Sequence, residues 1–70
     1  MEMRAIILRL PPEQIALFKA LVESYDNLAT LRTEDPQTHR LRLAFAAESS
    51  EDVEELLAGL AERFSITRYE

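Results

Sequence analysis

The sequence predicts an α+β domain in which a four-stranded antiparallel sheet carries two helices on one of its faces. Two segments of the 70-residue chain place apolar residues at helical spacing. Four other segments alternate apolar and polar residues, or are rich in strand-forming residues. These segments follow one another as strand, helix, strand, strand, helix and strand, and each is justified in turn below.

The first strand is predicted at residues 3–10, MRAIILRL, which end at two prolines. Alternate residues of a strand share a face. The two faces are Ile6, Leu8 and Leu10 on one side, and Met3, Ala5, Ile7 and Arg9 on the other. Because both faces are largely apolar, this strand is expected at the centre of the sheet.

The first helix is predicted from about Pro12 to Tyr25, since proline suits the first helical turn, where its missing N–H costs nothing. Asp26-Asn27 predicts the end of this helix, because asparagine tolerates the left-handed conformation there. The apolar residues that recur at helical spacing are Ile15, Phe18, Leu21, Val22 and Tyr25.

A hairpin is predicted next, with strands at residues 28–33 and 39–46 joined by a turn at Asp35-Pro36. The second of these strands alternates cleanly, which indicates burial on one face only. Its apolar face is Leu41, Leu43 and Phe45, and its other face is Arg40, Arg42 and Ala44. By the same alternation, Arg32 lies on the face opposite Leu31.

The second helix is predicted to open at residues 49–52, where Ser49 and Asp52 approximate a capping box. Its apolar stripe is Val53, Leu56, Leu57, Leu60 and Phe64. Residues 65–69, SITRY, predict the last strand. The resulting order is the ferredoxin-like arrangement, and no segment remains to cover the second face of the sheet.

Composition narrows the stabilising devices open to so short a chain. The formal net charge is −5, with one histidine and no cysteine. Disulfides and thiolate metal sites are therefore excluded, and we expect neither a metal nor a cofactor. Domains of this size usually need a disulfide, a metal or a partner subunit, so self-association as a homodimer or larger assembly is expected.

The first residues, MEMRAIILRLPP, do not predict a membrane or targeting segment. Their apolar run is interrupted by Arg4 and Arg9 and is too short for a signal peptide or a membrane span. We expect a soluble cytoplasmic protein. The acidic balance argues against general binding of nucleic acid, which needs basic surface.

The basic residues are not spread evenly over the predicted elements. Since Leu41, Leu43 and Phe45 must face the helices, Arg40 and Arg42 must face the uncovered side, and Arg32 joins them there. Most acids lie on helices and loops. Three interpretations stay open: a solvated face, a self-association surface around Met3, Ala5 and Ile7, or a surface for a ligand or nucleic acid.

No catalytic motif is present, and we expect no enzyme. As a catalytic base, His39 would need an oriented partner and a nucleophile or polarised substrate. Glu34 and Asp35 are near it in the sequence, but His39 is interpreted as an exposed turn residue. RNA-binding domains of this topology stack bases on two or three aromatic residues of the uncovered face. The strand aromatics here are Phe45 and Tyr69, and Phe45 is predicted to face the core, so almost no stacking surface is expected. Gly59, in the second helix, is either a tolerated weak point or a place of close backbone approach.

Residues 15–46 resemble the ACT domain family, in which helix one is followed by a short Asn-Ile/Leu segment leading into strand two. Asn27-Leu28 occupies that place. The chain is also similar to a group of short, uncharacterised bacterial proteins of ACT-like form that carry the stretch Glu-Ser-Tyr-(Asp/Glu)-Asn-Leu-Ala. Residues 23–29 read ESYDNLA. The resemblance implies that residues 1–70 form a single ACT-like domain.

ACT-like modules commonly pair side by side, and many bind an amino acid or a similar effector at that pairing. The resemblance therefore implies a stand-alone regulatory homodimer that senses a small anionic or amino-acid-like ligand, or a protein-interaction module. Arg32, Arg40 and Arg42 are the candidate contacts, because arginine pairs carboxylate or phosphate through two hydrogen bonds. Asn27 is a further candidate. The alternative is an RNA-binding domain that uses the basic uncovered face.

Overall fold

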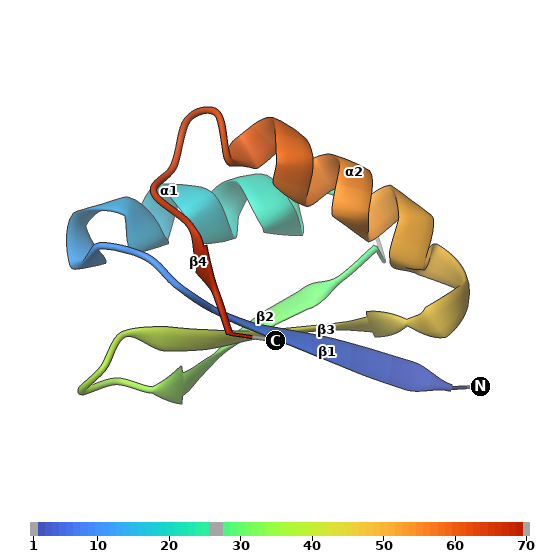
Figure 1. Ribbon diagram of the computed structural model, residues 1–70, viewed down its shortest axis with the longest axis horizontal. Coiled ribbons are helices and arrows are strands. Elements are labelled where there is room, and N and C mark those ends of the chain that lie inside the picture. Colours follow the sequence, from blue (N-terminus) through green and yellow to red (C-terminus); the bar gives the residue numbers. More distant parts are fainter. Residues whose placement is uncertain (1, 26–27, 70) are drawn as a thin grey trace.

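The computed structural model describes residues 2–25 and 28–69 (Figure 1). Its elements follow the predicted order: β1 (Met3–Arg9), α1 (Pro12–Glu23), β2 (Thr30–Asp35), β3 (Arg40–Ala46), a short 3-10 helix η1 (Ala47–Ser49), α2 (Ser50–Leu60) and β4 (Thr67–Arg68). The strands pair antiparallel in the order β2-β3-β1-β4. This is the ferredoxin-like arrangement that the sequence predicts.

Both helices lie on the same side of the sheet, and no element of the described chain lies on the other side (Figure 1). We call the uncovered side the open face. Between the helices and the sheet lies the hydrophobic core, which contains no buried polar or charged residue among those described. Its members are Ile6, Leu8, Leu10, Phe18, Val22, Leu31, Leu41, Leu43, Phe45, Val53, Leu57, Leu60 and Phe64.

The alternation of the strands decides which side chains enter this core. Leu8 is paired with Leu41, and Ile6 is paired with Leu43, so these apolar residues of β1 and β3 share the helix side. Leu31 of β2 is paired with Leu43 and joins the same layer. Phe18 closes the core from α1 and meets Phe64 edge to face, with ring centroids 5.4 Å apart. The predicted facing of all three strands is therefore confirmed.

Several element ends differ from the prediction. No side-chain cap is made by Ser49, because η1 leads into α2 and changes the geometry of the expected capping box. The first helix ends at Glu23 rather than Tyr25, and the Ser24 hydroxyl donates to the Leu21 carbonyl over 2.6 Å. Strand β2 begins and ends two residues later than expected, which leaves its facing unchanged.

The last strand is shorter than the predicted span 65–69. Only Thr67 and Arg68 are assigned to β4, although the Tyr69 N–H still donates to the Ile7 carbonyl over 2.8 Å. Residues 61–64 turn the chain after α2 before it reaches the sheet. Phe64, the last residue of the predicted apolar stripe, therefore lies in this turn and not in α2, and it is buried in the core.

Gly59 fits its interpretation as a tolerated weak point of the second helix. A Cβ built on this residue would meet nothing within 4 Å, so no backbone approaches it closely among the described residues. No helix in the described part of the chain is long and apolar enough to cross a membrane.

Candidate functional site

The basic residues of the open face lie on two rungs of the sheet that are separated by one rung facing the core. Arg9 of β1 is directly paired with Arg40 of β3, and Arg32 of β2 is directly paired with Arg42 of β3. All four side chains are exposed. We call Arg9, Arg32, Arg40 and Arg42 the basic sheet face. The prediction that Arg32, Arg40 and Arg42 share one exposed face is confirmed, and Arg9, predicted on the β1 face opposite the apolar one, lies there too.

The spacing between strands, and between residues of one strand, sets how closely these four arginines are grouped. Neighbouring strands are about 4.8 Å apart, and residues i and i+2 of one strand are about 6.7 Å apart. The four Cα atoms therefore fall within a patch of roughly 10 by 7 Å. Like charges that face each other directly across a ladder destabilise a sheet. This arrangement thus carries an electrostatic cost that the fold must offset elsewhere.

No carboxylate of the described residues forms an ion pair with any of these four arginines. The ion pairs among the described residues involve Arg4 and Arg68 instead. Asp35 is the acid paired with Arg40 on the ladder. Its Oδ1 accepts the Gln37 N–H over 3.0 Å and so closes the turn of the hairpin. The basic sheet face is therefore left with its positive charge available to a partner.

An aromatic ring borders the basic sheet face. The Arg40 guanidinium carbon lies 4.4 Å from the centroid of the Tyr69 ring. This cation–π contact reaches from β3 across β1 to the residue that follows β4. The Tyr69 side chain is still 42% exposed. The sequence identified Tyr69 as a strand aromatic but not as a site residue, although the apolar Ile66 three residues earlier indicates that Thr67 and Tyr69 face away from the core.

The other end of the open face is apolar. Met3 is 59% exposed, and Ala5 is exposed beside it on β1. Ala5 is paired with Ala44, and Met3 is paired with Ala46. The open face is therefore divided along the strands into a basic end and an end of small and apolar residues.

Two further strand arginines lie on the helix side and not on the basic sheet face. Arg68 is paired with the core residue Leu8, and its guanidinium makes two 2.8 Å hydrogen bonds to the carboxylate of Glu54 on α2. These hydrogen bonds lower the pKa of Glu54, against a small opposing effect of burial. Arg4 is paired with the core residue Phe45 and lies 3.8 Å from the carboxylate of Glu2.

A shallow hollow adjoins the basic sheet face at the turn between β1 and α1. Its volume is about 350 Å³, and its lining includes Arg9, Ser65 and Thr67 together with Leu10, Pro11 and Pro12. The Ser65 N–H is already engaged by the Gln14 side-chain oxygen over 2.9 Å. The side-chain donors of this hollow are thus the Arg9 guanidinium and the hydroxyl groups of Ser65 and Thr67.

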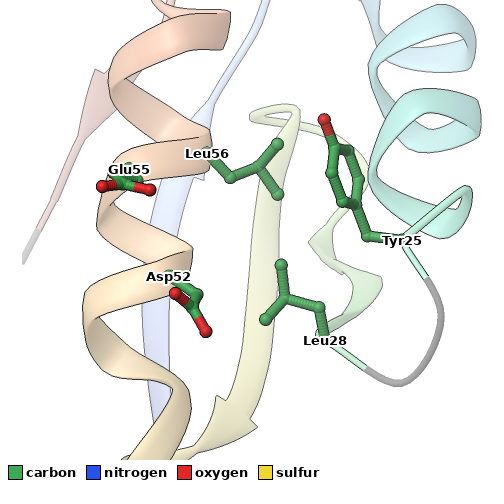
Figure 2. Close-up of a pocket in the computed structure, with 5 residues that line it drawn as sticks. All are labelled: Tyr25, Leu28, Asp52, Glu55 and Leu56. Atoms are coloured by element: carbon green, nitrogen blue, oxygen red, sulfur yellow. The ribbon is translucent and has the colours of Figure 1, made fainter.

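A larger hollow of about 520 Å³ lies on the helix side, between α2 and the segment that follows α1 (Figure 2). We call it the acidic groove. Leu56 points from α2 toward the Tyr25 ring, with Leu28 below them (Figure 2). The remaining lining residues, Asp52 and Glu55, are both acids. No basic side chain of the described residues lines the groove, so it offers no positive charge to the carboxylate of an amino acid.

The other candidates from the sequence contribute little to either site. His39 lies in the hairpin turn with a φ of 60°, a left-handed conformation, rather than within β3 as predicted. Asn27 falls outside the described residues. No group of three or more His, Asp or Glu side chains that could hold a metal occurs within residues 2–25 and 28–69.

Comparison with known proteins places the chain in a family without assigning it an activity. No curated protein and no solved structure matches it significantly. A family model described as a domain of unknown function, DUF4911, matches residues 8–63. This match bears out the similarity to small uncharacterised domains, while the ACT-like part of the resemblance stays a prediction. Since the match covers well over half of the chain, the protein belongs to the DUF4911 family.

Proposed function

We propose that this protein is a binding module that takes an anionic partner on its basic sheet face. The observation that carries the proposal is the pair of alternate rungs on which Arg9 faces Arg40 and Arg32 faces Arg42. Such pairs are unfavourable in an isolated sheet. An anion that bridges the guanidinium groups would turn that repulsion into charge-assisted hydrogen bonds.

Charge favours this surface over the acidic groove. The groove is the more concave of the two, but its carboxylates would repel an anion. The basic sheet face lies on the ordered ladder of three strands, which fixes the starting point of each arginine side chain. The neighbouring hollow, lined by Arg9, Ser65 and Thr67, adds one concave place for a carboxylate or phosphate group.

The ACT-like resemblance gives the proposal its regulatory form, a small-ligand sensor. It is supported by the order of elements and by the hollow at the turn between β1 and α1. ACT domains that bind amino acids usually carry a glycine at this turn, which lets the ligand approach the backbone. Here Pro11 and Pro12 stand there and supply no N–H donors. A ligand at this turn would depend on side chains, above all Arg9.

The proposal assigns binding rather than catalysis. Its test is thermal unfolding of the protein with inorganic phosphate, pyrophosphate, amino acids and inorganic polyphosphate. A ligand at 100 times its dissociation constant adds about 2.7 kcal/mol, and 1 kcal/mol moves the melting temperature of so small a domain by about 4–8 °C. At least one anion should therefore raise the melting temperature clearly.

The double variant Arg40→Gln, Arg42→Gln should lose most of this shift, because it removes half of the basic sheet face. Arg63→Gln is the matched control: Arg63 is an exposed arginine in the turn after α2, on the helix side. An equal shift in the double variant, or no shift with any anion in the wild-type protein, would refute the proposal.

Self-association is a second candidate, favoured by the apolar end of the open face. Met3 is 59% exposed at this end, beside Ala5 and the half-buried Ala44. A stable interface needs about 800 Å² from each partner, which requires most of one face of a domain this small. Sedimentation equilibrium should show a dimer that Ala5→Asp dissociates. A monomer at all concentrations would reject this candidate.

A further inference from the structure

Tyr69 lies on the open face, in line with the residues of the basic sheet face. Leu8 is paired with Arg68 and Arg9 with Thr67, so the next rung joins Ile7 and Tyr69. The hydrogen bond from the Tyr69 N–H to the Ile7 carbonyl confirms that rung. Because Ile7 is also paired with Arg42, the rung runs from Arg42 through Ile7 to the tyrosine ring.

The ring and the nearest arginine are already in contact in the folded protein. The Arg40 guanidinium lies 4.4 Å from the centroid of the Tyr69 ring, which limits the conformations open to both side chains. Binding a partner to this pair would therefore cost less side-chain entropy than binding to two freely rotating groups. The guanidinium lies over one face of the ring, and Tyr69 is still 42% exposed to a partner.

We propose that the anionic partner is a single-stranded nucleic acid. Arginines on an exposed sheet bind the phosphate groups, and an aromatic ring or guanidinium plane stacks on a base. A small anion would bind to the arginines alone and would make no use of the Tyr69 ring. This inference rests on the proposed function and adds a role for Tyr69.

The acidic composition of the chain does not oppose this surface. Helix α2, which carries four of the acids, lies on the other side of the sheet from the open face (Figure 1). Of these acids, Glu54 reaches the sheet, where Arg68 pairs with it. Packed layers lie about 10 Å apart, and charges are largely screened beyond about 10 Å at 0.1 M salt. The local potential at the open face is therefore set by its own arginines rather than by the net charge of −5.

The test is fluorescence anisotropy of a labelled decauridine with the full chain, at several salt concentrations. The logarithm of the binding constant should fall with the logarithm of salt by about 0.7 for each phosphate contacted. The double variant Arg40→Gln, Arg42→Gln should reduce this slope. Tyr69→Ala should weaken binding by roughly 5- to 150-fold, since stacking of one base contributes about 1–3 kcal/mol.

Three variants separate stacking from other effects. Tyr69→Phe keeps the ring and should retain most of the affinity, whereas Tyr69→Leu keeps apolar bulk but should behave as Tyr69→Ala. Tyr25→Ala removes the exposed tyrosine of the acidic groove and should change nothing. Circular dichroism confirms that each variant is folded. Equal affinity in Tyr69→Phe, Tyr69→Leu and Tyr69→Ala would overturn the inference.

Inorganic polyphosphate distinguishes failure of this inference from failure of the proposed function. If the decauridine binds more weakly in Tyr69→Ala while polyphosphate binding is unchanged, the ring recognises bases and the inference stands. If polyphosphate binds but the decauridine does not, the inference is overturned and the anion-binding proposal survives. If neither binds, and no small anion shifts the melting temperature, both are overturned.

Discussion

The basic sheet face and the acidic groove are opposite in charge and were formed in different ways. The arginines of the sheet face occupy alternate positions of strands whose register is set by backbone hydrogen bonds. The groove is instead lined by one side of α2 and by Tyr25 and Leu28, which lie outside regular elements. The alternation of side chains along the strands thus places the arginines on one face of the sheet, whereas most of the acids lie on the helical layer.

This comparison shows why net charge is a poor guide to the partner of a small domain. A chain with a net charge of −5 still presents four arginines within one patch of its sheet. Secondary structure separated the two signs, because the acids lie mostly on helices and turns. Each surface therefore has to be judged by its own residues.

The largest expected effect comes from the core that both surfaces share. Phe18 is fully buried and meets Phe64 edge to face. Phe18→Ala should lower the free energy of unfolding by about 3–5 kcal/mol, because it leaves a cavity. Urea denaturation followed by circular dichroism measures this, with Leu17→Ala, at an exposed position of α1, as the control. A decrease in the free energy of unfolding of less than about 1 kcal/mol would contradict the burial of Phe18 in the core.

A smaller effect is expected on the helical side alone. Gly59→Ala should raise the free energy of unfolding by up to about 1 kcal/mol, since glycine in a helix costs that much relative to alanine. The space for the added methyl group is open. The melting temperature should rise, and the reverse change at the neighbouring exposed residue, Ala58→Gly, should lower it. A decrease for Gly59→Ala would indicate a contact that the structure does not show.

The corresponding change on the sheet side tests the repulsion between facing arginines. Arg32→Thr should stabilise the protein by roughly 0.2–1 kcal/mol, because it removes one of two like charges that are paired across the ladder. The gain should shrink at high salt, which screens exposed charges. Denaturation at low and high salt measures it. A destabilisation that does not depend on salt would mean that the facing arginines do not repel.

The smallest expected effect concerns the ion pair between Arg68 of β4 and Glu54 of α2. The Arg68 guanidinium lowers the pKa of Glu54, so the ionised carboxylate favours the folded state. This contribution is present above the ordinary pKa of 4.5 and is lost as pH falls through the lower folded value. Both side chains are about half exposed, so it amounts to less than about 1 kcal/mol.

Glu54→Gln should remove this dependence. Its stability curve should be flatter than that of the wild-type protein in the acid range and should meet it at the lowest pH at which both still fold. Thermal unfolding at a series of pH values measures both curves. Glu55→Gln, which removes a neighbouring acid of the groove, is the control. Parallel curves for wild type and Glu54→Gln would show that the ion pair contributes nothing.

The sequence by itself determined which side of each strand is buried, and with it most of the basic sheet face. Alternation decides facing whatever the exact ends of a strand, so Arg32 stays on the open face although β2 is shifted by two residues. Helix ends were less predictable, because η1 replaced the expected capping geometry at Ser49.

Only the tertiary structure decided which residues from different strands meet. Arg9 joins Arg40 because the β1–β3 register places them on one rung, and Tyr69 joins them because β4 pairs with β1. The acidic groove likewise depends on how α2 lies beside the segment after α1. Periodicity acts within one element and is readable along the chain. Register and packing depend on contacts between residues far apart in sequence, and these exist only once the whole core has formed.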